Sequence, residues 1–141
     1  MIARIDHIGI AVQSINESLK FFEDALGMKL DHVASEEGGR TMVAFMPVGS
    51  SDVELVEPQD AESGLGKFLA KRGEGVHHIC FEVDDIDAAL ARLKAHGAQL
   101  IDETPRTNSS GMKLAFIHPK SAHGVLIELY QRPMTKDKGR K

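Results

Sequence analysis

Two segments of the chain show the same alternation of large apolar residues with small or polar ones. The first segment reads His7-Ile8-Gly9-Ile10-Ala11-Val12, and the second reads His78-Ile79-Cys80-Phe81-Glu82-Val83. Successive side chains of a β-strand point to opposite faces of a sheet, so a period of two predicts a strand with one face against the core. We expect both segments to be strands, each with its histidine on the face opposite the large apolar residues.

These two segments belong to a longer internal repeat. His7 and His78 are separated by the same number of residues as Leu19 and Leu90. Near the end of each half lies a second matching pair, Val53-Glu54-Leu55 and Ile127-Glu128-Leu129, at a slightly longer offset. Three residues inserted in a loop account for the difference. The repeat predicts two modules, at about 1–58 and 75–133.

A helix is expected after the first strand of each module. Ser14 and Glu17 have the spacing of a capping box, and Gly27 is placed to end the helix. Between the two ends, apolar residues recur at helical spacing: Ile15, Leu19, Phe22 and Leu26. The second module has its own set of such signals, which are the cap Asp85, the stripe Ile86, Leu90 and Leu93, and the stop Gly97.

Three shorter strands are expected to complete each module. They lie near 28–35, 40–47 and 51–57 in the first module, and near 98–102, 112–118 and 124–131 in the second. The predicted order is βαβββ twice, an α+β fold of two paired modules. A helix at about 64–72 should link the modules, with Gly73 and Gly75 after it.

Alternation along the strands predicts where the polar residues point. The helix of each module must cover the apolar face of its sheet. His7 and His78 then point to the opposite, open face, and so do Glu54 and Glu128, which lie between apolar neighbours in the last strands. Two curved half-sheets placed side by side would form a trough with these four residues on its floor.

Two imidazoles and two carboxylates are ligands that suit a divalent ion such as Zn, Co, Ni, Mn or Fe(II). Unpaired carboxylates in a partly dry trough are unfavourable, and a cation removes that penalty. The alternative interpretation is that the histidines are hydrogen-bonded strand residues and the glutamates lie at the surface. The repetition of one His and one Glu in each module favours the metal site.

The other histidines and the cysteine are weaker candidates. His77 is the alternative to His78, but its parity directs it to the helix side of the strand. Cys80 shares the face of His78, although a lone cysteine is more often a small buried apolar residue than a ligand. Three histidines have no partner in the repeat and are expected at the surface: His32, His96 and His123.

Composition narrows the class of protein. The 141 residues suit one domain, expected at 1–133, followed by a flexible basic tail at 134–141. The net charge of −4 gives no reason to expect nucleic-acid binding, and one cysteine permits no intrachain disulfide. The N-terminus lacks the apolar core of a signal peptide, and no stretch approaches the roughly 20 apolar residues of a membrane span. A cytoplasmic protein without membrane contact is expected.

Five segments of the sequence resemble the methylmalonyl-CoA epimerase family of the vicinal oxygen chelate superfamily. They are Asp6–Val12, Val53–Pro58, Gly75–Cys80, Phe116–Ser121 and Gly124–Leu129. The opening strand motif is shared across the superfamily. The His77-His78-Ile79 block, taken together with the blocks from His118 to Ser121 and from Gly124 to Leu129, is more specific to the epimerases. The resemblance runs from about residue 2 to residue 133.

This resemblance implies a fold, an activity and a ligand set. The family fold pairs βαβββ modules around a metal-bearing cleft, often in a homodimer, and its members interconvert (R)- and (S)-methylmalonyl-CoA. One divalent ion per chain (Co, Mn, Zn, Ni or Mg) would be held by the positions of His7, His78 and Glu128, with Glu54 at a fourth ligand position. Some epimerases have Gln at that fourth position, whereas Glu is common there in glyoxalase I relatives.

Epimerisation through an enolate requires proton transfer on both faces of the reacting carbon. Glu128 is the expected acid–base group, and Glu54 is the best-placed candidate for the other, with a metal-bound water as the alternative. Some epimerases use a separate glutamate on the third strand. The matching position here is Met42, which cannot move a proton.

Three further residues are candidates for binding the substrate carboxylate. Ser110 and Gly111 lie in the loop Thr107–Met112, whose backbone N–H groups suit an anion. An ordinary polar hairpin loop explains the same residues equally well. Lys120 follows Pro119 and is expected either to pair with the carboxylate or to cap a strand. The acyl-CoA nucleotide should lie outside the trough.

Two other functions fit the same fold. A glyoxalase I-type lactoylglutathione lyase can have the same His, Glu, His, Glu ligand set, but the block from His118 to Ser121 argues against it. A non-catalytic small-molecule-binding protein of this superfamily uses an aromatic-lined cleft and typically lacks the metal ligands. The chain has no Trp and one Tyr, and it keeps all four ligand residues, which disfavours that class.

Overall fold

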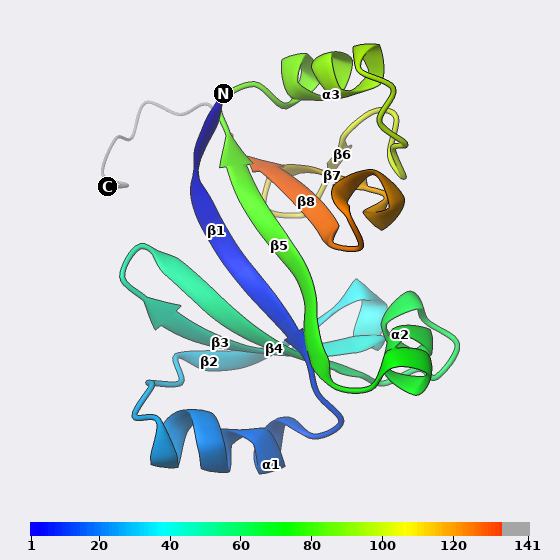
Figure 1. Ribbon diagram of the computed structural model, residues 1–141. Helices are drawn as coiled ribbons and strands as arrows, with labels where there is room; N and C mark the ends of the chain where they lie inside the picture. Colours follow the sequence, from blue (N-terminus) through cyan, green and yellow to red (C-terminus); the bar gives the residue numbers. More distant parts are fainter. Residues whose placement is uncertain (134–141) are drawn as a thin grey trace. The chain divides into compact units, whose positions relative to one another are not determined.

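A computed structural model describes residues 1–133 of the chain (Figure 1). The expected basic tail at 134–141 lies outside the described residues. The elements follow in the order β1 (Ile2–Ala11), α1 (Ile15–Leu19), the π-helical segment η1 (Lys20–Ala25), β2 (His32–Glu36), the 3-10 segment η2 (Glu37–Gly39), β3 (Thr41–Val48), β4 (Ser51–Pro58), α2 (Gly64–Arg72), β5 (Gly75–Val83), α3 (Ile86–Ala95), β6 (Arg106–Thr107), β7 (Lys113–Ile117), the 3-10 segment η3 (Pro119–Ala122) and β8 (Leu126–Gln131). On each side of α2 the order is βαβββ, as the repeat predicts.

The chain forms two compact units. The first unit is Ile5–Ile79, and its strands lie in the order β2-β3-β4-β1, with β1 parallel to β4 and the remaining pairs antiparallel. The second unit joins Met1–Arg4 to the chain from Cys80 onward, and its strands lie in the order β5-β8-β7-β6. The boundaries of these units fall within β1 and β5, whereas the sequence repeat places the module boundary between residues 58 and 75.

The first helix begins as predicted but does not continue as an α-helix. The hydroxyl of Ser14 accepts a hydrogen bond from the N–H of Glu17 at 3.1 Å. After Leu19 the chain widens into η1, where the N–H of Leu26 donates to the carbonyl of Phe21, five residues earlier. The wider turn rotates the later side chains, so that Leu26, expected on the buried stripe, is 56% exposed.

The sheet of the first unit has a separate core on each face. On the α1 side lie Val12, Ile15, Ala44, Met46 and Leu55. On the other face lie Ala11, Val43, Val56 and Leu65, with Phe68 and Leu69 of α2 packed against them. Neighbouring residues such as Ala11 and Val12 therefore belong to opposite faces, which confirms the predicted alternation. The face expected to be open is covered in part by α2.

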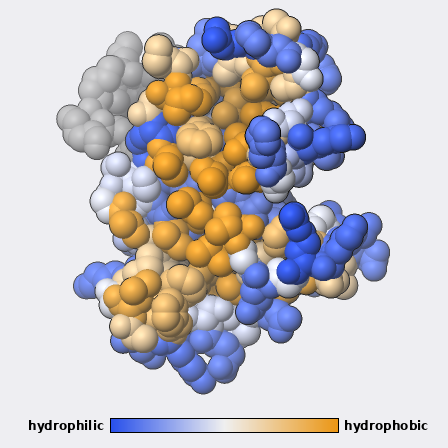
Figure 2. All heavy atoms as spheres, viewed as in Figure 1, coloured by the Kyte–Doolittle hydropathy of each residue, from blue (hydrophilic) through white to orange (hydrophobic). Residues whose placement is uncertain are grey.

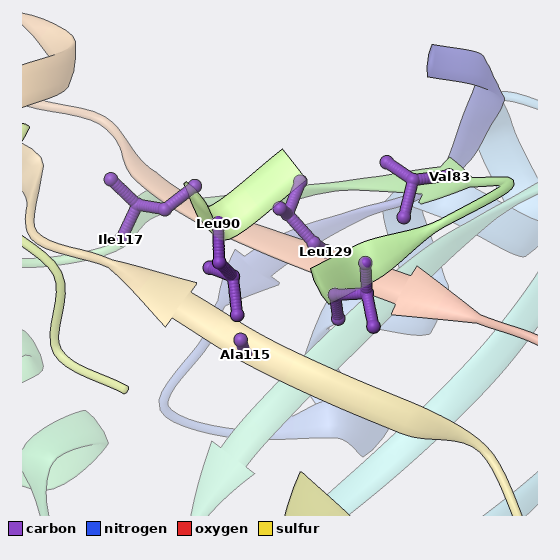
Figure 3. Packing of buried hydrophobic residues seen from close by; sticks show 6 residues of the cluster. Val83, Leu90, Ala115, Ile117 and Leu129 are labelled. Atoms are coloured by element: carbon purple, nitrogen blue, oxygen red, sulfur yellow. The ribbon is translucent and has the colours of Figure 1, made fainter. Parts of the chain in front are cut away.

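The core of the second unit lies between α3 and its sheet (Figure 3). The carboxylate of Asp85 caps α3 by accepting from the N–H of Ala88 at 3.0 Å, as predicted. Figure 3 shows the buried cluster, which comprises Val83, Ile86, Leu90, Ala115, Ile117 and Leu129. Leu129 lies in this core, so its neighbour Glu128 points to the opposite face of β8.

The strand expected at 98–102 is reduced to one bridge, between Leu100 and Ile117. The carboxylate of Asp102 accepts a hydrogen bond from the N–H of Phe116 at 2.8 Å and pairs with Arg106. A side chain thus takes a hydrogen bond that a continuing strand would have made with its backbone. The paired edge strand β6 forms four residues later, at Arg106–Thr107.

Several large apolar side chains remain exposed on β1 and β5, where Figure 2 shows apolar surface. Ile2 is 53% exposed, Ile5 42% and Val76 57%. Within residues 1–133, the helices are too short and too polar to cross a membrane.

Candidate metal centre

Two histidines from equivalent places in the repeat meet in the first unit. His7 of β1 is 2% exposed and His78 of β5 is 8% exposed. Their Nε2 atoms lie 3.0 Å apart, and their rings are nearly perpendicular, at 87°. Two nitrogens that bind one ion at about 2.0–2.1 Å lie roughly 2.9–3.4 Å apart, for ligand angles between a right angle and the tetrahedral value. The separation of the two Nε2 atoms fits such an ion.

Glu54 joins these histidines. It lies on β4, is 9% exposed, and stands beside Gly9 of β1 in the parallel register. One ligand atom each from His7, Glu54 and His78 lie within 4.8 Å of one another. The Oε2 atom of Glu54 is 3.3 Å from Nδ1 of His7, so its carboxylate must turn to reach the Nε2 edge of that ring. The structure thus brings together three of the four residues predicted as ligands.

The fourth predicted ligand, Glu128, belongs to the second unit. It lies on β8 opposite Phe116 of β7 and is 6% exposed. Its side chain points away from the α3 core, on the face expected from the sequence. A carboxylate buried to this extent requires compensation by hydrogen bonds or a cation.

Each of the two histidines has a contact at its other ring nitrogen. The Oδ2 atom of Asp6 lies 2.8 Å from Nδ1 of His7, and Nδ1 of His77 lies 3.0 Å from Nδ1 of His78. The sequence pattern predicts no role for Asp6, and the parity of β5 directs His77 away from the site. Instead, the ring of His77 stands edge-on to Phe68 of α2, at 4.8 Å between centroids. The repeat itself was the available signal, since Asp6 and His77 occupy the same place in the two modules.

Burial determines the protonation states of His77 and His78. Burial, with smaller contributions from the neighbouring rings of His7 and His77, lowers the pKa of His78 to about 3. Burial also lowers the pKa of His77, against an opposing effect of the Glu37 carboxylate. Both imidazoles are therefore neutral at physiological pH, which is the form that binds metal ions.

Met42, the third-strand position that the resemblance matches to a glutamate, does not point to the face of Glu54. Met42 of β3 packs in the core on the α1 side, with Ala44 and Met46. Its side chain therefore lies on the face opposite Glu54, because Glu54 pairs with Phe45 and shares a face with Val43 and Thr41. The side chain at the position that the resemblance matches to a glutamate therefore belongs to the core on the α1 side.

In the loop Thr107–Met112, proposed above to bind an anion, backbone N–H groups donate to acceptors within the loop itself. The backbone N–H groups of Ser110 and Met112 donate to the side-chain oxygen of Asn108, and that of Gly111 donates to the Asn108 carbonyl. These three donors are satisfied within the loop, which fits the alternative of an ordinary polar hairpin. Lys120 is exposed in η3, and its N–H donates to Nδ1 of His118.

The remaining candidates lie where the sequence predicts. Cys80 is fully buried, as expected for a small apolar residue. His32, His96 and His123 are exposed. They take no part in the group formed by His7, Glu54 and His78.

Comparison with known proteins identifies the family. A profile of the Glyoxalase/Bleomycin resistance protein/Dioxygenase superfamily matches residues 6–116. The chain belongs to this superfamily. An uncharacterised protein of Bacillus subtilis is 44% identical over 126 residues, which are 89% of this chain and 90% of that protein.

Members of the superfamily with known activity are similar over nearly the whole chain. An ethylmalonyl-CoA/methylmalonyl-CoA epimerase of Cereibacter sphaeroides is 35% identical over 133 residues, covering 93% of this chain and 99% of that protein. A solved structure of a methylmalonyl-CoA epimerase in complex with methylmalonyl-CoA and NH4+ is 37% identical, with a TM-score of 0.84 and coverage of 94% and 96%. These relatives confirm the resemblance to epimerases, the vicinal oxygen chelate fold and the expectation of an isomerase.

Proposed function

We propose that the protein is a metal-dependent epimerase that interconverts (R)- and (S)-methylmalonyl-CoA by moving the proton at C2. The observation that carries the proposal is the convergence of His7, Glu54 and His78, at 4.8 Å or less between ligand atoms, in a chain similar to methylmalonyl-CoA epimerases. Acyl-CoA is the substrate class that follows from the same relatives.

The donor set supports one divalent ion per chain. Two buried imidazoles, of which that of His78 is neutral at physiological pH, and a buried carboxylate are the ligand types that Co, Mn, Zn and Ni accept, and Mg also accepts the carboxylate. Glu128 is proposed as the fourth ligand. A divalent cation at this place would act as a Lewis acid and stabilise the negative charge that develops on the thioester oxygen.

The side chains of the protein move the proton. Inversion at C2 requires that a proton leaves one face of the carbon and returns to the other. We assign one acid–base role to Glu128, a buried carboxylate on the open face of β8. Glu54 is assigned mainly to coordination and is the candidate for the second acid–base group. Met42 does not compete with it, because its side chain packs against the α1 core.

Lys120 remains the proposed partner of the substrate carboxylate. Its side chain is exposed, and η3 begins at Pro119 immediately before it. We also propose a homodimer, which the exposed apolar side chains on β1 and β5 support, including those of Ile2, Ile5 and Val76. Sedimentation of the full chain at several concentrations tests the oligomeric state.

The decisive experiment follows the proton at C2. Metal-loaded protein is incubated with (S)-methylmalonyl-CoA in deuterated water, and deuterium incorporation and formation of the (R) form are measured by NMR and by a stereospecific assay. We expect both, and we expect both to disappear after chelation and return when metal is added. A parallel assay with the hemithioacetal of methylglyoxal and glutathione tests lactoylglutathione lyase activity. Activity with the hemithioacetal alone would refute the epimerase assignment.

A further inference from the structure

The internal repeat includes the residues that immediately precede His7 and His78 in the sequence. Asp6 precedes His7, and His77 precedes His78, so these two preceding residues also match each other in the repeat. In the structure each preceding residue touches Nδ1 of its histidine, at 2.8 Å for Asp6 and 3.0 Å for His77. The two modules thus place a partner at the same ring atom, although one partner is a carboxylate and the other an imidazole.

The chemistry of imidazole explains why this atom matters. A neutral imidazole carries one proton, and a metal binds the nitrogen that lacks it. The Nε2 atoms of His7 and His78 face each other, so a shared ion requires the proton of each ring on Nδ1. That N–H group then needs an acceptor, and such an acceptor fixes both the tautomer and the orientation of the ring.

Ring contacts hold His77 where its Nδ1 atom can accept a hydrogen bond from Nδ1 of His78. Its ring is perpendicular to that of His78 and stands edge-on to Phe68, at 86°. Phe68 in turn packs on the core formed by Ala11, Val43, Val56 and Leu65. The helix α2 thus supports the His77 ring. For Nδ1 of His77 to accept from His78, the proton of His77 must lie on its Nε2 atom.

We propose that His77 is a positioning residue that accepts the Nδ1–H of His78 and keeps Nε2 of His78 available to the metal, as the counterpart of Asp6 at His7. This inference rests on the proposed metal site. An imidazole acceptor is uncharged, whereas the Asp6 carboxylate is negative, so His78 is the less basic of the two ligands. The two modules therefore hold the ion unequally in spite of the repeat.

The test compares substitutions that keep or remove an acceptor at the place of Nδ1. In His77→Asn, the side-chain oxygen replaces Nδ1, whereas in His77→Phe no acceptor remains. Zn²⁺ affinity is measured on the full chain by competition with a chelator. The ring nitrogen of His78 that binds the ion, and the one that carries the proton, are read from long-range ¹H–¹⁵N spectra of the Zn²⁺-loaded protein. His96→Phe, at an exposed histidine of the second unit, is the matched control.

We expect His77→Phe to weaken Zn²⁺ binding by about 10–100-fold and to give a mixture of Zn²⁺-bound forms in which either ring nitrogen of His78 binds the ion. His77→Asn should stay within about threefold of the original affinity, keeping His78 protonated at Nδ1, although it also loses the contact with Phe68. His96→Phe should change neither readout. The proposal is overturned if His77→Phe retains affinity and the Nδ1–H tautomer, or if His77→Asn is as impaired as His77→Phe. Because neither readout involves a substrate, loss of the epimerase assignment alone would leave this result unaffected.

Discussion

The ring of His78 lies directly against the backbone of Gly9. A Cβ atom built on Gly9 would stand 2.2 Å from Cε1 and 2.5 Å from Nδ1 of that ring. The ring of His78, a proposed metal ligand on β5, therefore occupies the space that a side chain on β1 would fill. Gly9 also stands beside Glu54 in the parallel register of β1 and β4, so its lack of a side chain leaves room among the three proposed ligand residues.

Gly9→Ala should displace the His78 ring, because the new methyl group cannot coexist with it. We expect Zn²⁺ affinity to fall at least about tenfold, and overpacking to lower the free energy of unfolding by roughly 1–3 kcal/mol. Chelator competition and urea unfolding measure the two effects. Gly64→Ala, in open space at the start of α2, is the matched control and should change neither quantity appreciably. Undiminished metal binding in Gly9→Ala would show that His78 is not a ligand.

Glu128→Gln should remain slow even when metal occupancy is restored. An amide cannot accept the proton, and loss of one acid–base group typically reduces the rate by about 10²–10⁴-fold. Epimerisation is measured on protein whose metal content has been determined. Near-normal turnover at full occupancy would remove Glu128 from the acid–base role.

Glu54→Gln separates coordination from proton transfer. If Glu54 only coordinates, metal-loaded activity should stay within about an order of magnitude of the original, because an amide oxygen is still a ligand. If Glu54 is the second acid–base group, the loss should equal that of Glu128→Gln. In that case the variant should exchange the C2 proton of one stereoisomer with deuterated solvent without inverting it. We expect the first outcome.

The metal-free protein should lose stability as the pH falls below about 6.5, the ordinary pKa of histidine. In the folded state burial lowers the pKa of His78 to about 3, so between these values the unfolded chain binds more protons. Stability from this residue is complete above a pH of about 6.5 and is progressively lost towards a pH of about 3. Urea unfolding across this acidic range and up to neutral pH measures the slope. Replacement of His78 by Asn should reduce it, and an unchanged slope would contradict the lowered pKa.

Much of the candidate site follows from the sequence because a strand alternates its faces with a fixed period. His7 and Glu54 can be assigned to one face from their apolar neighbours alone, and the repeat transfers the same reasoning to His78 and Glu128. Helix caps are local as well, so Ser14 and Asp85 were identifiable from spacing. The same periodicity places Met42 on the opposite face, in the core on the α1 side.

Other features depend on packing between segments that are distant in sequence. The contact of His77 with His78 depends on Phe68 of α2, and α2 covers part of a face that alternation alone presents as open. The Asp102 carboxylate replaces part of an expected strand because Phe116 lies within its reach. The sequence by itself determined the modules, the faces and the residue types of the site. Only the tertiary structure decided which nitrogen of each histidine faces its partner, because ring orientation is set by neighbours from other elements and not by the strand that carries the ring.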